Sequence, residues 1–79
     1  MTPAPAFKHI GGDLIHRGRW LSPERAQAYD ALFRKEAQLA HIAGDDDGFA
    51  WANSLLTELV AAKIAQTQWV RAMNVRWAA

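Results

Sequence analysis

The amino-acid sequence predicts an all-α fold in which two helices form an antiparallel hairpin after a short N-terminal segment. Two stretches, residues 24–43 and 49–79, contain neither glycine nor proline, and only five residues separate them. Sixteen of the 79 residues are alanine, the residue with the highest intrinsic helix propensity. A chain of this length forms one domain at most, so we expect residues 1–79 to fold as a single small unit.

The first helix is expected to span about residues 22–43. Ser22 can cap its N-terminus, because a serine side chain accepts hydrogen bonds from the first backbone N–H groups of a helix. Pro23 suits the first helical position, where its missing N–H is not needed. Apolar residues then recur at spacings of three and four up to Gly44, a residue typical of helix C-termini.

The second helix is expected to follow an acidic turn at residues 44–48 and to run from about residue 47 to residue 78, filling the segment 49–79. Any of the three aspartates in the turn can cap it. A calcium loop of the EF-hand type is excluded, because Phe49 and Leu56 occupy positions that such a loop fills with oxygen ligands.

Apolar residues cover more than one face of the second helix. One stripe comprises Ala52, Leu56, Leu59, Val70, Met73 and Trp77, and another comprises Trp51, Leu55, Ala62 and Trp69. A single neighbouring helix can cover only one of these faces. We therefore expect a second copy of the chain to cover the other, most simply in a homodimeric, antiparallel four-helix bundle.

Residues 1–21, the N-terminal arm, leave two interpretations open. Gly11 and Gly12 separate two short segments that could form strands, residues 7–10 and 13–16, which is the pattern of a two-residue β-hairpin loop. An irregular arm anchored by Leu14, Trp20 and similar side chains fits the same residues. An isolated hairpin is only marginally stable in water, so the arm is expected to pack on the helices.

Composition and motifs exclude several classes of function. The chain has no cysteine, so it forms no disulfide and no thiolate zinc site. No serine lies in a nucleophile elbow and no glycine pattern forms a phosphate loop, so we expect no enzymatic activity and no cofactor. Signal peptides and long apolar runs are absent, and we expect a cytoplasmic protein that does not interact with membranes.

Histidines are the only candidates for a metal or small-ligand site. His9 and His16 could converge across the predicted β-hairpin, and His41 lies near the end of the first helix. None of the three has the spacing of a known ligand pair, and we therefore expect no metal site.

Tryptophan and arginine residues predict a surface that binds another protein. Four tryptophans in 79 residues is a high density, and both residue types are enriched at binding hot spots. The candidates lie on the distal part of the second helix and on the arm: Trp69, Arg71, Arg76, Trp77, Arg19 and Trp20. We expect a small non-enzymatic interaction module that docks on a larger protein as an adaptor, assembly factor or inhibitor, as many accessory proteins of bacteria and phages do.

The alternative is a small dimeric nucleic-acid-binding or regulatory protein. Its candidate residues are the basic side chains near the arm: Lys8, Arg17, Arg19 and Arg25. Arginine contacts phosphates, and the neighbouring aromatic side chains can stack on bases. Two acidic residues also lie in this segment, which leaves a small excess of positive charge for phosphate binding.

Overall fold

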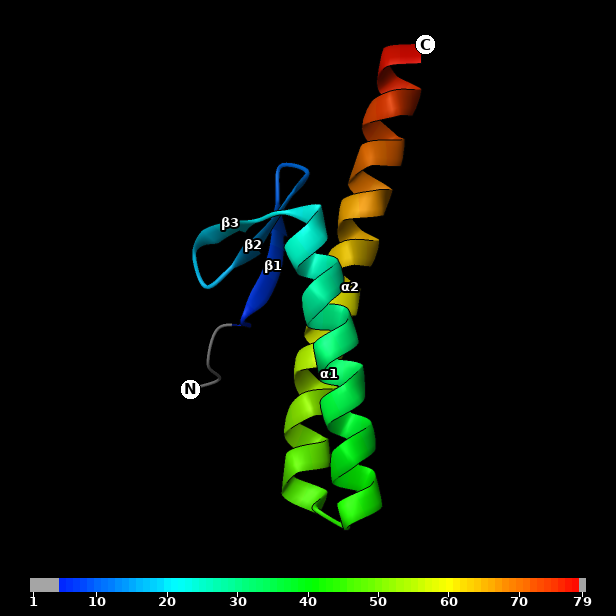
Figure 1. Ribbon diagram of the computed structural model, residues 1–79. Helices are drawn as coiled ribbons and strands as arrows, with labels where there is room; N and C mark the ends of the chain where they lie inside the picture. The colour runs from blue at the N-terminus through cyan, green and yellow to red at the C-terminus, as the bar shows by residue number, and fades with distance from the viewer. Residues whose placement is uncertain (1–4, 79) are drawn as a thin grey trace.

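The computed structural model describes residues 5–78 of the chain, with side chains up to Arg76. Three strands, β1 (Phe7–Ile10), β2 (Asp13–His16) and β3 (Arg19–Leu21), precede two helices, α1 (Pro23–Ala43) and α2 (Asp46–Ala78). The two helices lie side by side as an antiparallel hairpin, and the sheet lies beside one half of it (Figure 1). The molecule is elongated, with extents of 53 × 28 × 17 Å.

Both ends of α1 confirm the signals in the sequence. The Ser22 hydroxyl accepts a hydrogen bond from the backbone N–H of Arg25 at 3.2 Å, as an N-cap does. Gly44 adopts a left-handed φ of 72°, and the next residue, Asp45, donates its N–H to the carbonyl of Ala40 at 2.8 Å. These bonds satisfy carbonyls that the helix leaves without partners.

Asp45 is the aspartate that caps α2. Its carboxylate accepts from the N–H of Gly48 at 2.9 Å, and its carbonyl accepts from the N–H of Phe49 at 3.0 Å. Asp46 and Asp47 occupy the first turn of the helix, where negative charge is favourable. Within residues 5–78, neither helix contains an apolar stretch of the length that crossing a bilayer requires.

The two helices differ in length, and this determines the shape of the molecule. The helix α2 has 33 residues and α1 has 21, a difference of about 18 Å at 1.5 Å per residue. Figure 1 shows the last turns of α2 projecting beyond the start of α1 and beyond the sheet. We call residues 70–76, which lie in this part, the α2 extension, and residues 36–53, around the α1–α2 turn, the hairpin tip.

The N-terminal segment is a three-stranded antiparallel sheet, so the prediction of a purely all-α fold is corrected and the irregular-arm interpretation is wrong. The strand order is β1-β2-β3. Gly11 and Gly12 form the predicted hairpin loop, with φ angles of 58° and 91°. A second two-residue loop, Arg17-Gly18, also has two positive φ angles, 49° and 81°. Such loops match the natural twist of paired strands.

One face of the sheet closes the hydrophobic core over the helical hairpin. Phe7, Leu14 and Leu21 are buried on that face, against Ala26 and Phe33 of α1 and Leu59 and Ala62 of α2. The rings of Phe7 and Phe33 meet edge to face, with centroids 5.9 Å apart. The sheet therefore covers part of the second apolar face of α2, for which we had expected a second copy of the chain. The dimeric bundle stays a prediction.

The β1–β2 loop is held on α2 by two side chains. The amide of Gln66 donates a hydrogen bond to the carbonyl of Gly12 at 2.8 Å. The indole of Trp69 lies so close to Gly12 that a Cβ atom there would come within 2.6 Å of Cζ3. Glycine at position 12 thus supplies both a left-handed backbone and the space that Trp69 occupies.

We expect Gly12→Ala to destabilise the protein more than Gly18→Ala. Both residues have a positive φ, but a Cβ at Gly18 would meet no atom within 4 Å. Gly18→Ala should therefore lower the free energy of unfolding by about 1 kcal/mol through backbone strain alone. Gly12→Ala should lower it by about 1–2 kcal/mol more through overpacking. Urea denaturation followed by circular dichroism measures both values.

The same comparison in a Trp69→Ala background is the control. Without the indole, the two glycine substitutions should cost equal amounts, because only the backbone term remains. A difference that persists in this background would show that the loop is not held by Trp69.

Candidate interaction surfaces

The outer face of the sheet carries the most exposed tryptophan among the described side chains. Side chains alternate between the two faces of a strand, and the register pairs Lys8 with Ile15 and Ile15 with Trp20. These three side chains therefore share the face that points away from the helices. The side chain of Trp20 is 62% exposed. An aromatic ring at this level of exposure is a suitable anchor for a protein partner.

A small cavity lies beside Trp20. Its volume is about 190 Å³, and its lining includes Trp20, Pro23, Lys63 and Gln66. Trp20 thus borders a hollow between the end of the sheet and the two helices. Arg19, the preceding residue, is also exposed, but it pairs with His16 and therefore lies on the opposite face of the sheet from Trp20.

Trp69, another predicted anchor, is partly used within the molecule. Its side chain is 39% exposed, and its ring packs on Gly12 and meets the ring of His9 edge-on at a centroid distance of 6.0 Å. Trp69 therefore holds the sheet on α2. A role in binding a partner would be additional to this structural role.

The remaining predicted anchors lie on or near the α2 extension, away from Trp20. Arg71 and Arg76 are exposed on α2, and the side chain of Trp77 lies outside the described residues. The structure therefore divides the predicted surface into separate parts. Trp20 lies on the outer face of the sheet and Arg19 on its other face, whereas Arg71 and Arg76 lie on the α2 extension.

A groove between α1 and α2 was not predicted from the sequence. Its volume is about 440 Å³, and it is lined by Asp30, Arg34, Val60, Lys63, Ile64, Thr67, Gln68 and Arg71. The two helices are consecutive in the chain, but the lining residues of one lie far in sequence from those of the other and meet only when the hairpin forms. The groove contains three cationic side chains and one carboxylate, so its lining carries a net positive charge.

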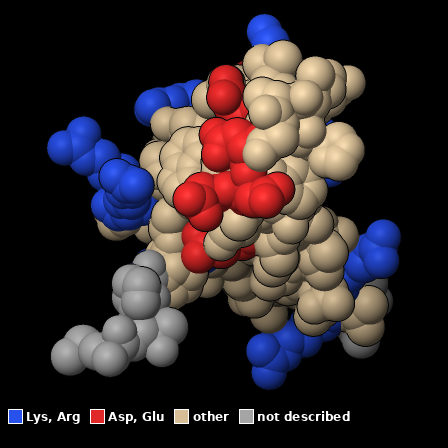
Figure 2. All heavy atoms as spheres, turned by 90° about the horizontal axis from the view of Figure 1, so that it is seen from below, with Lys and Arg blue, Asp and Glu red and all other residues tan. Residues whose placement is uncertain are grey.

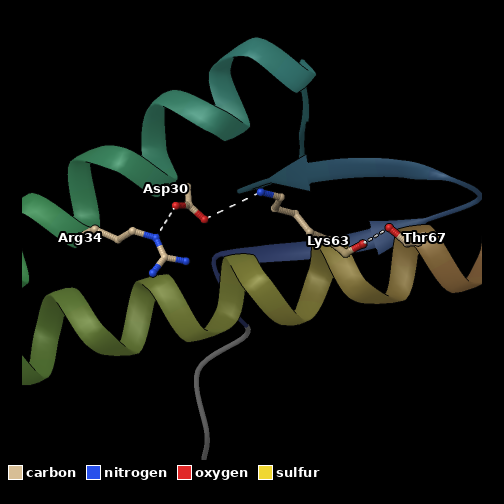
Figure 3. Close-up of polar contacts among 4 residues, drawn as sticks. All are labelled: Asp30, Arg34, Lys63 and Thr67. Atoms are coloured by element: carbon tan, nitrogen blue, oxygen red, sulfur yellow. Dashed lines mark hydrogen bonds and ion pairs between the residues drawn. The ribbon is translucent and has the colours of Figure 1, made fainter.

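The single carboxylate of the groove, Asp30, is neutralised by two cations (Figure 3). Nε of Arg34 donates to Asp30 at 2.6 Å, and Nζ of Lys63 lies 3.8 Å from the other carboxylate oxygen. The hydrogen bond from Arg34 lowers the pKa of Asp30, partial burial opposes this, and the charges of Arg34 and Lys63 lower it further. Asp30 therefore stays ionised and links α1 to α2.

Charge is distributed unevenly along the molecule. Residues 36–58, which include the whole hairpin tip, contain five carboxylates and no lysine or arginine. All nine lysine and arginine residues lie in the rest of the chain. Figure 2, a view onto the end of the molecule at the α1–α2 turn, shows acidic side chains gathered at the centre and basic side chains at the margins. The molecule thus has one strongly acidic end.

Three of the four basic residues of the nucleic-acid hypothesis gather around His16. The His16 ring stacks on Phe7 at a centroid distance of 4.5 Å and meets Tyr29 edge-on at 5.0 Å. Arg19 is its cross-strand partner. Burial, and then the positive charges of Arg17 and Arg25, lower the pKa of His16. Lys8, the fourth residue, lies on the opposite face of the sheet.

The histidines do not form a ligand set. The register places His9 opposite Leu14 and His16 opposite Phe7. The two histidines are therefore not cross-strand partners, although the sequence suggested that they could converge across the β-hairpin. Nε2 of His9 instead accepts a hydrogen bond from the N–H of Gly12 at 3.0 Å. Among the residues that the structure describes, no three potential ligands lie close enough together to hold a metal ion.

No protein-family model matches this chain, and neither a curated protein nor a solved structure shows significant similarity to it. Its function therefore has to be inferred from the surfaces described above.

We expect stability to fall below neutral pH because of His16. Its pKa in the folded protein is below the ordinary value of 6.5, so the unfolded chain binds the proton more tightly. The stability that neutral His16 confers is thus present above about pH 6.5 and is lost as the pH falls through the folded-state pKa. Urea denaturation at about pH 7.5 and about pH 5.5 should show the loss.

Two variants identify the histidine responsible. His16→Phe keeps an aromatic ring against Phe7 but cannot be protonated, so it should flatten the pH dependence. His41→Gln should retain the dependence of the unmodified protein. The assignment fails if His16→Phe loses as much stability on acidification as the unmodified protein does.

Proposed function

We propose that this chain is a small, non-enzymatic protein-interaction module. The observation that supports this proposal is the exposed area of the chain, which is 6085 Å². A compact monomer of the same mass is expected to expose about 4,800 Å². The excess of about 1,300 Å² is larger than the roughly 800 Å² that one partner buries in an interface of standard size. The chain therefore exposes enough additional surface for a complete interface.

The chemistry of the exposed side chains supports a protein as the partner. Trp20 and Arg19 belong to the residue types that supply most hot spots, and Trp20 borders a hollow of about 190 Å³. Strand β3 is at the edge of the sheet, where its backbone can also pair with an added strand. We propose that a larger protein docks on this part of the sheet.

The helical hairpin supplies a second surface, and we propose that it forms a homodimer. Two hairpins packed together would form the antiparallel four-helix bundle expected from the sequence. The lack of cysteine is consistent with a reducing compartment, and we propose that the module acts in the cytoplasm.

Photo-cross-linking in cells of the source organism tests docking at Trp20. With p-benzoylphenylalanine in place of Trp20, ultraviolet light should produce one discrete adduct with a larger protein. The same group in place of Gln27, an exposed residue of α1, should produce none. With the purified partner, Trp20→Ala should then weaken binding about 30-fold, the equivalent of about 2 kcal/mol. Gln27→Ala should have no effect. Unchanged affinity for Trp20→Ala would remove the sheet from the docking surface.

A second candidate function, nucleic-acid binding, is favoured by the three arginines around His16. If they contact phosphates together, affinity for a labelled oligonucleotide should fall steeply with salt, with a log–log slope of about −3. Replacing Arg17, Arg19 and Arg25 by glutamine should abolish binding, measured by fluorescence anisotropy. Lys8→Gln, on the opposite face of the sheet, is the matched control. No binding at low salt would eliminate this candidate.

A further inference from the structure

We propose that the first partner of this module is a second copy of the same chain, lying antiparallel to it, so that the α2 extension of each copy covers the hairpin tip of the other. The inference rests on the proposed function and specifies one of its interfaces. It follows from two uncovered apolar regions at opposite ends of the molecule and from the opposite charges that surround them.

The α2 extension carries the first uncovered region. Val70 follows Leu59 by eleven residues, about three helical turns, and therefore lies on the same face of α2. At Leu59 this face is fully buried, whereas at Val70 it is 41% exposed. The reason is length, because α1 begins at Pro23 and does not reach the α2 extension. The core-facing stripe of α2 thus continues past the helix that covers it.

The hairpin tip carries the second uncovered region. The sheet lies beside the other half of the hairpin (Figure 1), so apolar side chains near the tip have no third layer over them. Trp51 is 59% exposed and Leu39 is 50% exposed. Trp51 meets the core residue Phe33 edge-on, at a centroid distance of 6.4 Å. One face of an additional helix would cover these side chains.

Charge selects the orientation in which two copies associate. The hairpin tip contains Glu36 and the aspartates at 45–47, with no lysine or arginine. From residue 59 to the end of α2, the charged residues are Lys63, Arg71 and Arg76, all basic. A parallel pair would bring acidic tip against acidic tip. An antiparallel pair brings each acidic tip to the basic α2 extension of the other copy, and such complementarity fixes orientation.

The available area fits a closed dimer. An antiparallel pair related by a two-fold axis uses the tip–extension contact twice, which leaves neither end unpaired. The excess exposed area, about 1,300 Å² per chain, exceeds the roughly 800 Å² per partner of a standard interface. This excess is large enough for one interface of standard size with a second copy.

A pair of charge-reversal variants tests the arrangement. One variant combines Asp46→Lys with Asp47→Lys in the tip, and leaves the capping residue Asp45 unchanged. The other combines Arg71→Glu with Arg76→Glu in the α2 extension. In either variant alone, the substituted side chains face like charges at both contacts of the dimer. A mixture of the two forms a heterodimer in which both contacts again join opposite charges.

Light scattering on a sizing column, over a range of concentrations, should give the unmodified protein twice the 8.8 kDa mass of one chain. For each variant alone, the dissociation constant of the dimer should be at least about tenfold higher than that of the unmodified protein. Mixing the variants should restore the dimer. This rescue also excludes misfolding as the cause of dissociation. Lys8→Glu with Arg17→Glu, on the sheet, is the control and should leave the dimer intact.

Other outcomes would overturn the inference. Variants that dimerise as tightly as the unmodified protein would show that these charges do not meet. Dissociated variants that stay monomeric when mixed would exclude the tip–extension pairing. Particles that keep growing with concentration would indicate open head-to-tail chains. A monomeric unmodified protein would exclude self-association. None of these results bears on docking at Trp20, which the cross-linking experiment decides separately.

Discussion

The packing of Phe7 against the helical hairpin is the interaction on which the rest of the structure depends. Its ring is buried and contacts the rings of His16, Tyr29 and Phe33. Two helices alone form too small a core for a stable domain, and small domains without disulfides or metals need another source of burial. Here the sheet supplies the additional burial as a third layer. Phe7 of β1 stacks on His16 of the neighbouring strand β2 and also packs against Phe33 of α1.

This arrangement separates the surfaces that are available for binding. The inner face of the sheet is occupied by the core, so its outer face with Trp20 points to solvent on one side of the molecule. The acidic hairpin tip and the basic α2 extension lie at the two ends of a 53 Å long molecule. In the proposed dimer the two ends are occupied, whereas the outer face of the sheet takes no part in the contact. In the proposed assembly, the second copy and the larger protein would therefore contact different surfaces of the chain.

Local chemistry made the helical hairpin predictable. Ser22, Pro23 and Gly44 act through hydrogen bonds and dihedral angles of their own neighbourhood, so their positions alone indicated where α1 begins and ends. The Gly11-Gly12 loop was also visible, because glycine suits its positive φ angles. The Arg17-Gly18 loop was missed because arginine seldom adopts a left-handed conformation. Without this loop the third strand had no signal, and the fold was predicted as all-α.

The sequence by itself determined the two helices, their caps and the excess of apolar residues on α2, because these depend on residues close together in the chain. Only the tertiary structure decided what covers that excess. The sheet covers the apolar surface of α2 near Ala62 and Trp69. The apolar surface near Val70 stays exposed because α1, which begins at Pro23, does not extend that far along α2. The groove between α1 and α2 could not be predicted from the sequence for the same reason, because Asp30 and Lys63 meet only when the two helices pack. Periodicity shows that a face is apolar, but the identity of its neighbour depends on contacts between distant segments.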